Sequence, residues 1–222
     1  MTRIAILISG RGSNMQALAD SVKAMSHSTI CLVAADKACP GIDSATALGI
    51  PTKIVNRADF DSRDAHDLAM CAALDDVTPD YIFMAGYMAI VGTTFVARFA
   101  PRILNIHPSL LPAYKGLNTH ERVLADGTKK HGVSVHIVSE RLDDGPLILQ
   151  AALDVDPGVN PTTLAARVLV LEHILYPFVL DSLACGDLEV THSGVNWRNR
   201  EAALSRLDHE TRVQIEPALI WP

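Results

Sequence analysis

Short apolar runs recur along the first half of the chain and constrain its fold more than any other feature of the sequence. Most are apolar throughout rather than alternating, as strands covered on both faces are. They lie at Ile4–Ile8, Ile30–Ala35, Thr52–Val55, Tyr81–Ala85 and Ile103–Ile106. Stretches with helical spacing separate them, at Ser13–Met25, Ile42–Leu48, Ser62–Leu74 and Thr94–Phe99. Strands that alternate with helices predict an α/β fold, with a mostly parallel β-sheet flanked by helices.

The second half of the chain predicts later strands of the same sheet. Alternation at His131–Val138 and an apolar run at Pro146–Leu153 indicate strands of mixed direction, and Pro161–Leu183 indicates one long helix. A length of 222 residues favours a single domain, here with a Rossmann-like sheet. We expect that domain to span residues 1–190, and the more polar residues 191–222 to form a surface extension of it.

Charge and composition exclude several classes of protein. The formal net charge of −6 argues against nucleic-acid binding, which needs clustered Lys and Arg. The N-terminal apolar run is too short for a secretory signal, and no stretch approaches the roughly 20 apolar residues of a membrane span. We therefore expect a cytoplasmic protein without a membrane partner. None of the four cysteines forms a C-x-x-C pair, so all four are expected to be free thiols.

A glycine-rich segment, Ser9–Asn14, follows the first predicted strand and opens a helix. Glycines allow a close approach to a ligand, and the free amides at a helix N-terminus face an anion. Three interpretations are open: a phosphate monoester site, a dinucleotide site, or a structural turn with a helix cap. Met15 occupies the third glycine position of the dinucleotide motif G-x-G-x-x-G/A, whereas Asp36 lies where a ribose-binding acid would fall.

Asn105 and His107 lie two residues apart at the end of a predicted strand. In an extended chain their side chains point to the same side, and open α/β sheets bind ligands beyond the carboxyl ends of their strands. A carboxamide and an imidazole placed together can donate hydrogen bonds to an oxyanion and move protons. The alternative is a strand-ending Asn with a packed His. Asp143 likewise stands in Asp-Asp-Gly-Pro, which is also an ordinary turn sequence.

A metal site would be a rival use of the histidines and aspartates. His131 and His136 are five residues apart, so on one regular strand they face opposite sides and cannot chelate together. The sequence has neither an H-E-x-x-H motif nor a cysteine pair. No catalytic metal is therefore expected.

The segment Asn105–Pro112 resembles the signature shared by formyltransferases and hydrolases that use 10-formyltetrahydrofolate. Leu142–Pro146, with Ile148–Gln150 after it, resembles the loop that carries the essential aspartate of these enzymes. Three further segments narrow the resemblance to the phosphoribosylglycinamide formyltransferase family, namely Ile8–Asn14, Phe60–Arg63 and His131–His136. The resemblance runs from about residue 3 to about residue 190, and its motifs occur in the order that the family has.

The resemblance implies transfer of the formyl group of 10-formyltetrahydrofolate, a co-substrate, to the amine of glycinamide ribonucleotide in de novo purine (IMP) biosynthesis. It implies a monomer or homodimer without a metal, and a catalytic trio of Asn105, His107 and Asp143. The substrate phosphate and ribose would contact Gly12, Ser13, Asn14 and Glu172. The folate would contact Arg63, Met88, Ala89, Ile90, Val91, Val138 and Asp143.

Three residues depart from the family pattern, and all three concern the folate site. Asp144 stands where the family usually has Gly, Asn118 replaces a usual His, and Ala89 replaces a usual Arg. Other functions also stay open on this scaffold. They are a formyltetrahydrofolate hydrolase, usually with an N-terminal regulatory domain; a methionyl-tRNA formyltransferase, usually with an additional C-terminal domain; and a nucleotide-binding module without catalysis.

Overall fold

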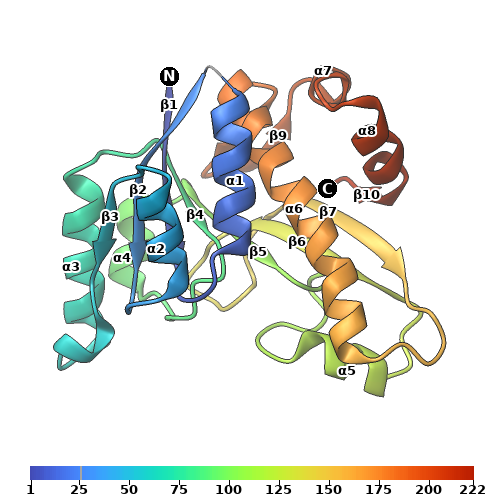
Figure 1. The fold of residues 1–222 in the computed structure, drawn as a ribbon, viewed down its shortest axis with the longest axis horizontal. Coiled ribbons are helices and arrows are strands. Elements are labelled where there is room, and N and C mark those ends of the chain that lie inside the picture. The colour runs from blue at the N-terminus through green and yellow to red at the C-terminus, as the bar shows by residue number, and fades with distance from the viewer. Residues whose placement is uncertain (26) are drawn as a thin grey trace. The chain divides into compact units, whose positions relative to one another are not determined.

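The computed structural model describes residues 1–25 and 27–222. These residues form two compact units, Met1–Asn105 and Ile106–Pro222 (Figure 1). The hydrogen-bonded strand order is β10-β7-β6-β5-β4-β1-β2-β3, and the chain passes from one unit to the other within β5. The predicted fold class, a mostly parallel sheet flanked by helices, is confirmed.

Parallel strands form the framework of the first unit. The four strand pairs β1–β2, β1–β4, β2–β3 and β4–β5 are all parallel. Side chains of β1 from Ile4 to Ile8 are fully buried, which explains why this run is apolar throughout. The strands are β1 (Thr2–Ile8), β2 (Ser28–Ala35), β3 (Thr52–Ile54), β4 (Tyr81–Met84) and β5 (Ile103–His107).

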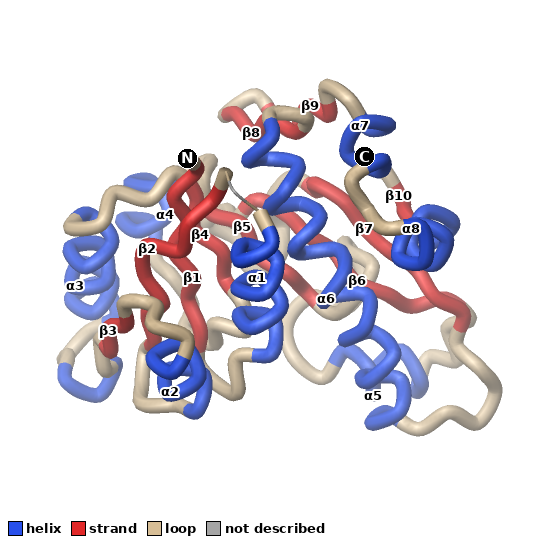
Figure 2. Tube along the Cα trace, turned by 45° about the horizontal axis from the view of Figure 1, so that its top comes forward, coloured by secondary structure: helices blue, strands red, loops and turns tan. Residues whose placement is uncertain are grey.

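Helices cover both faces of these parallel strands (Figure 2). Right-handed crossovers place α1 and α2 on one face and α3 and α4 on the other, because the chain reverses its direction across the sheet after β3. Each predicted helix is present, although α2 begins two residues before its predicted start, with Pro40 in the first turn. The elements are α1 (Ser13–Ala24), α2 (Pro40–Ala47), η1 (Arg57–Asp59), α3 (Arg63–Asp75) and α4 (Thr93–Phe99).

Antiparallel strands form the framework of the second unit. Strand β6 (Lys130–Ile137) pairs with β7 (Leu147–Asp154), which confirms the predicted mixed direction. Two helices accompany them, α5 (Thr119–Ala125) and α6 (Pro161–Cys185). Asn160 caps α6 by accepting a 2.8 Å hydrogen bond from the amide of Thr163. Helix α6 is long and apolar enough to cross a membrane, but 61% of its most apolar stretch is buried, as in the core helix of a globular protein.

The C-terminal residues pack onto β7 rather than extending from it. Leu219 and Ile220 form β10, which pairs antiparallel with Ala151 and Gln150. The indole of Trp197 donates a 2.9 Å hydrogen bond to the carbonyl oxygen of Ile148. The remaining elements are β8 (Leu188–Thr191), β9 (Gly194–Trp197), α7 (Arg200–Ser205), α8 (His209–Ile215) and η2 (Glu216–Ala218). The division predicted at residue 190 stays a prediction.

Aromatic side chains hold this C-terminal segment to α6. The ring of Trp197 stacks on Phe178 of α6, with the centroids 5.8 Å apart. Trp221 meets Trp197 edge to face at 4.7 Å, and the guanidinium of Arg200 lies 4.7 Å from the ring centroid of Trp221. Such contacts add specific geometry to the burial of large apolar rings.

Candidate active site

Strand β5 delivers two of the predicted catalytic residues. Asn105 and His107 lie two residues apart on this extended strand, so their side chains share one side of it. His107 is buried, and Asn105 is partly exposed. The strand ends at His107 because Pro108 follows, and the amide of Ser109 turns back to donate a 2.8 Å hydrogen bond to the carbonyl oxygen of His107.

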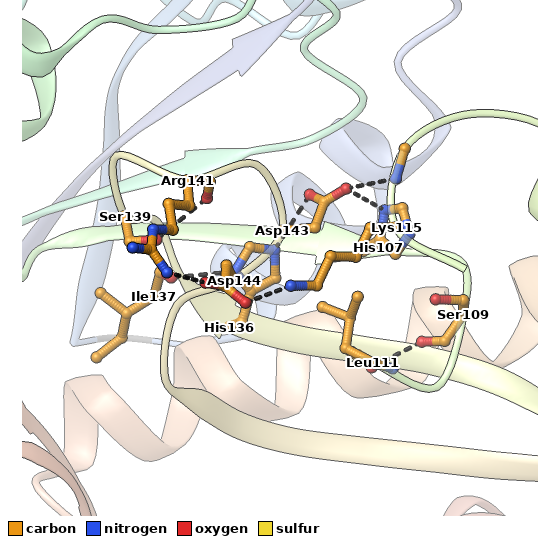
Figure 3. A network of polar contacts seen from close by, with 12 residues as sticks. His107, Ser109, Leu111, Lys115, His136, Ile137, Ser139, Arg141, Asp143 and Asp144 are labelled. Carbon is orange, nitrogen blue, oxygen red and sulfur yellow. Dashed lines mark hydrogen bonds and ion pairs between the residues drawn. The ribbon is translucent and has the colours of Figure 1, made fainter. Parts of the chain in front are cut away.

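The imidazole of His107 lies between two acceptors of the second unit (Figure 3). Its Nε2 is 3.0 Å from the carbonyl oxygen of Tyr114, which can only accept, so Nε2 carries a proton. Its Nδ1 is 3.5 Å from Oδ2 of Asp143. If His107 is protonated, each of its two N–H groups therefore faces an acceptor. The structure thus brings together two of the three predicted catalytic residues, although they are 36 positions apart in the sequence.

Asp143 is fixed by its backbone as well as by its neighbours. Its φ of 49° is left-handed, a conformation that Asp adopts more readily than most other residues with a Cβ atom. The amide of Gly116 donates a 2.9 Å hydrogen bond to Oδ2, while Nε2 of His136 lies 3.7 Å from Oδ1. The turn sequence and the catalytic assignment are therefore compatible, because the same turn presents the carboxylate to two histidines.

His136 lies behind Asp143 on β6 and is fully buried. Its Nδ1 lies 3.0 Å from the carbonyl oxygen of Ile137, so Nδ1 is the donor. Burial lowers the pKa of His136, while that carbonyl and the charge of Asp143 oppose the shift. Burial therefore favours the neutral form of the ring near pH 7.

A buried polar network fixes the segment that follows His107. The hydroxyl of Ser134 donates to the carbonyl oxygen of Ser109 at 2.6 Å and accepts from the amide of Leu111 at 3.0 Å. The side-chain amide of Gln150 donates one hydrogen bond to the hydroxyl of Ser134 at 2.7 Å and one to the carbonyl oxygen of Leu111 at 3.0 Å. These bonds leave the Ser109–Leu111 backbone little freedom, and so they restrain the orientation of the histidine before it.

Asp144, one of the three departures from the family pattern, forms an ion pair with Lys115 on the outside of the cluster. The hydrogen bond from Lys115, with its charge, lowers the pKa of the Asp144 carboxyl. Arg141 Nη1 lies 3.8 Å from the other carboxylate oxygen. The positive φ in this turn belongs to Asp143 and not to Asp144. A side chain at position 144 therefore needs no strained backbone, and Gly is not required there.

The glycine-rich segment of the first unit has the features of an anion site. Gly12 is the residue before α1 and has a φ of 79°, and no side chain caps this helix. Ser13 and Asn14 follow as its first residues. A Cβ atom on Gly12 would lie 3.0 Å from Cα of Gly41, and the amide of Gly41 donates a 3.0 Å hydrogen bond to the carbonyl oxygen of Gly10. The loop is therefore packed closely at the N-terminus of a helix, a place where proteins commonly bind anions.

Asp36 keeps the dinucleotide interpretation open. Its side chain is buried just after β2, and its Oδ1 has no hydrogen-bond partner within residues 1–25 and 27–222. A buried acceptor in this position is compatible with a ribose hydroxyl. The geometry of the loop alone therefore does not separate a phosphate monoester from a dinucleotide.

Most of the seven predicted folate residues are apolar, and three of the seven are exposed. In the first unit, 61% of Met88 and 58% of Ile90 are exposed, and Arg63 is exposed at the start of α3. Ala89 and Val91 are partly exposed in the same segment. In the second unit, Val138 directly follows β6, at the start of the turn that carries Asp143. Glu172, predicted to contact the ribose, is buried on α6.

Sequence reasoning missed several groups around His107 and Asp143. The carbonyl of Tyr114 and the amide of Gly116 are backbone groups, so residue type gives no signal for them. Asp144 stands out in the sequence only as a departure from the family pattern, and nothing in the sequence pairs it with Lys115. His136 lies only seven positions before Asp143, in the strand that leads into the turn, but the spacing of the histidines does not reveal that its Nε2 lies near the carboxylate.

Comparison with known proteins gives consistent results along most of the chain. The model of the formyl transferase family matches residues 2–180. Phosphoribosylglycinamide formyltransferase of Escherichia coli is 42% identical over 196 residues, which cover 87% of this chain and 92% of that protein. The human trifunctional purine biosynthetic protein adenosine-3 is 40% identical over 202 residues. The alignment covers 90% of this chain but only 20% of that longer protein.

Solved structures agree with these sequence relatives. Phosphoribosylglycinamide formyltransferase from Coxiella burnetii, solved in complex with CHES, superposes with a TM-score of 0.85 at 42% identity. The match covers 89% of this chain and 93% of that one. The enzyme of the same name from Brucella melitensis is 48% identical, with a TM-score of 0.79 and coverages of 83% and 96%.

Proposed function

The chain belongs to the formyl transferase family, and we propose that it transfers the formyl group of 10-formyltetrahydrofolate to the amine of glycinamide ribonucleotide. This step would serve de novo purine (IMP) biosynthesis. The observation that carries the proposal is the contact of His107 with Asp143. Asn105 lies two residues before His107 on strand β5. The identity to enzymes that are named for this reaction supports it.

The reaction is an acyl transfer between two amines. The amine of the ribonucleotide attacks the formyl carbon, and the carbonyl electrons move to oxygen to form a tetrahedral oxyanion. The oxyanion then collapses, the bond to the folate nitrogen breaks, and the attacking amine gives up its proton. The catalyst must stabilise the oxyanion, accept this proton and deliver one to the leaving nitrogen.

Each member of the trio can supply one of these functions. The carboxamide of Asn105 can donate to the oxyanion. Asp143 can accept the proton of the attacking amine, directly or through water, because its carboxylate is held in place by the amide of Gly116. His107 in its cationic form stabilises negative charge nearby. Both ring nitrogens of His107 face protein acceptors, the carbonyl of Tyr114 and the carboxylate of Asp143. To donate directly to the oxyanion, the ring must therefore give up its contact with one of these acceptors.

Binding of the two substrates is assigned to separate sets of residues. We assign the substrate phosphate to Gly12, Ser13 and Asn14, at the N-terminus of α1, and the ribose to Glu172. The folate is assigned to Arg63, to the segment from Met88 to Val91, and to Val138 with Asp143. We expect a cytoplasmic enzyme, a monomer or homodimer, that needs no metal.

A formyl-transfer assay tests the proposal. The protein is incubated with 10-formyltetrahydrofolate and glycinamide ribonucleotide, and formylated ribonucleotide is measured by mass spectrometry. We expect product only when both substrates are present, and His107→Ala serves as the inactive control. Release of formate from the folate alone, at a rate that the ribonucleotide does not raise, would instead indicate a hydrolase. Formylation of methionyl-tRNA would indicate a methionyl-tRNA formyltransferase, and calorimetric binding of NAD would indicate a nucleotide-binding module; we expect neither.

A further inference from the structure

The segment from Met88 to Val91 has no regular secondary structure, and yet it carries four of the residues assigned to the folate. It lies between the end of β4 and Gly92, the residue before α4. Two of its apolar side chains, Met88 and Ile90, are mostly exposed. A loop of this kind is mobile by default, so a binding wall built from it needs support from outside the segment.

One buried hydroxyl supports the first end of the segment. The amide of Met88 donates a 2.7 Å hydrogen bond to Oγ of Ser9, and Ser9 is 4% exposed. The ladder between β1 and β4 continues to the amide of Ala85, which donates to the carbonyl oxygen of Leu7. Ser9 therefore provides the acceptor from the β1 side after the chain has left the sheet.

One buried carboxylate supports the other end. The amide of Gly92 donates a 2.6 Å hydrogen bond to Oδ2 of Asp67, a residue of α3 that is 2% exposed. A Cβ atom on Gly92 would lie 3.0 Å from that oxygen, so glycine permits the close approach. The partner carboxylate oxygen lies 3.7 Å from Nδ1 of His66, whose Nε2 donates to the carbonyl oxygen of Val55 at 3.0 Å. One oxygen of the Asp67 carboxylate thus accepts the hydrogen bond from Gly92, and the other lies beside the His66 ring.

Helix α3 also carries a residue that is assigned to the folate. Arg63 lies one turn before Asp67, and its Nε would be 3.5 Å from a Cβ atom on Gly92. Asp67 therefore ties the segment to the same helix that presents Arg63. Burial of a carboxylate is costly, and a surface loop that needed no defined conformation would gain little from it.

We propose that Ser9 and Asp67 are positioning residues that hold the two ends of the Met88–Val91 segment in the conformation that binds the folate. The proposal rests on the proposed function, because the segment is assigned to the folate there. Neither residue is expected to touch the formyl group or the attacking amine. Their removal should therefore affect binding of the folate more than binding of the ribonucleotide.

Four variants test this proposal in pairs. Ser9→Ala removes the acceptor for Met88 and Ser9→Thr keeps a hydroxyl, whereas Asp67→Ala removes the acceptor for Gly92 and Asp67→Asn keeps an oxygen. We expect KM for the folate to rise about tenfold in each alanine variant, the loss expected for one charge-assisted or well-aligned hydrogen bond. KM for the ribonucleotide should change less than about twofold, and Ser9→Thr and Asp67→Asn should recover most of the loss. Asp76→Asn, a substitution of the exposed acidic residue at the C-terminal cap of α3, is the matched control.

Hydrogen exchange provides a measurement that does not depend on turnover. The amides of Met88 and Gly92 should exchange faster in Ser9→Ala and Asp67→Ala respectively, while the amides of β1 and β4 keep their protection. Equal losses for both substrates, or unchanged exchange at Met88 and Gly92, would overturn the proposal. If the wild-type protein transfers no formyl group, the proposed function fails, whereas the exchange data and direct titration with 10-formyltetrahydrofolate still decide whether the two ends are held.

Discussion

The imidazoles of His120 and His131 meet edge to face in the second unit, and Nδ1 of His120 lies 3.0 Å from Nε2 of His131. One nitrogen must donate and the other accept, so at most one of the rings can be charged while this bond persists. Burial lowers the pKa of both histidines, and that of His131 falls to about 4. The charges of His120 and His107 contribute, after burial, to this low pKa of His131.

From the lowered pKa of His131, we expect the protein to lose stability as the pH falls from about 6.5 to about 4. An unfolded histidine has a pKa of about 6.5, so in this window the unfolded state binds more protons than the folded state. The contribution of His131 is complete above pH 6.5 and is lost towards pH 4. Urea unfolding at pH 7.5 and pH 5 measures the difference, which should shrink in His131→Gln. An identical difference in the variant would mean that other groups cause it.

Loss of any member of the trio should abolish most of the turnover. Asn105→Ala, His107→Ala and Asp143→Ala are each expected to lower kcat by about 10²–10³-fold, the usual effect of removing one donor to an oxyanion. KM should change less, because Asn105 and His107 are assigned to the binding of neither substrate, and Asp143 is only one of the seven residues assigned to the folate. Steady-state kinetics with both substrates measures this. Near-normal kcat in one variant would remove that residue from the mechanism.

The backbone at Gly12 should be sensitive to any side chain. Gly12→Val places a branched Cβ at a φ of 79°, 3.0 Å from Cα of Gly41. We expect KM for the ribonucleotide to rise at least about tenfold while KM for the folate changes little, because α1 amides are assigned to the phosphate. Gly10→Ala is the control, since a Cβ there has no atom within 4 Å. An equal rise for both substrates would indicate that the loop was wrongly assigned or that the variant is misfolded.

The ion pair between Lys115 and Asp144 should be detectable by titration. Lys115 lowers the pKa of the Asp144 carboxyl, so Lys115→Met is expected to return this pKa towards the ordinary value for aspartate. The ion pair of the wild type should then persist to lower pH than an isolated carboxylate would allow. NMR titration of the side-chain carboxyl carbon gives the value directly. An unchanged pKa in Lys115→Met would show that the pair does not form in solution.

Much of the framework is predictable from the sequence, because buried parallel strands have a strong signature. Residue type alone predicts a buried strand at Ile4–Ile8. Spacing alone predicts that the side chains of Asn105 and His107 share one side of a strand. The position of Asp143 is less predictable. A turn sequence does not indicate that its side chain contacts a residue 36 positions earlier in the chain. Its assignment depends on resemblance, and its contact with His107 depends on the folded chain.

Other parts of the molecule have no sequence signature at all. Asp67 is one of several acidic residues on α3, and only the close approach of Gly92 distinguishes it. Strand β10 comprises two residues, Leu219 and Ile220, too few to form a periodic pattern. In both cases the deciding interaction is a hydrogen bond that a backbone amide forms at long range, and the sequence does not reveal which amide a given residue will meet.

The aromatic cluster at the C-terminal segment has a consequence for spectroscopy. Trp197 and Trp221 are the only two tryptophans of the chain, and they lie in contact with each other. Intrinsic fluorescence excited at the red edge therefore reports on the attachment of this segment to Phe178, and not directly on the loops around Asp143. A fluorescence transition that precedes the loss of circular dichroism would mark early detachment of the segment, while coincident transitions would mark a single cooperative unit.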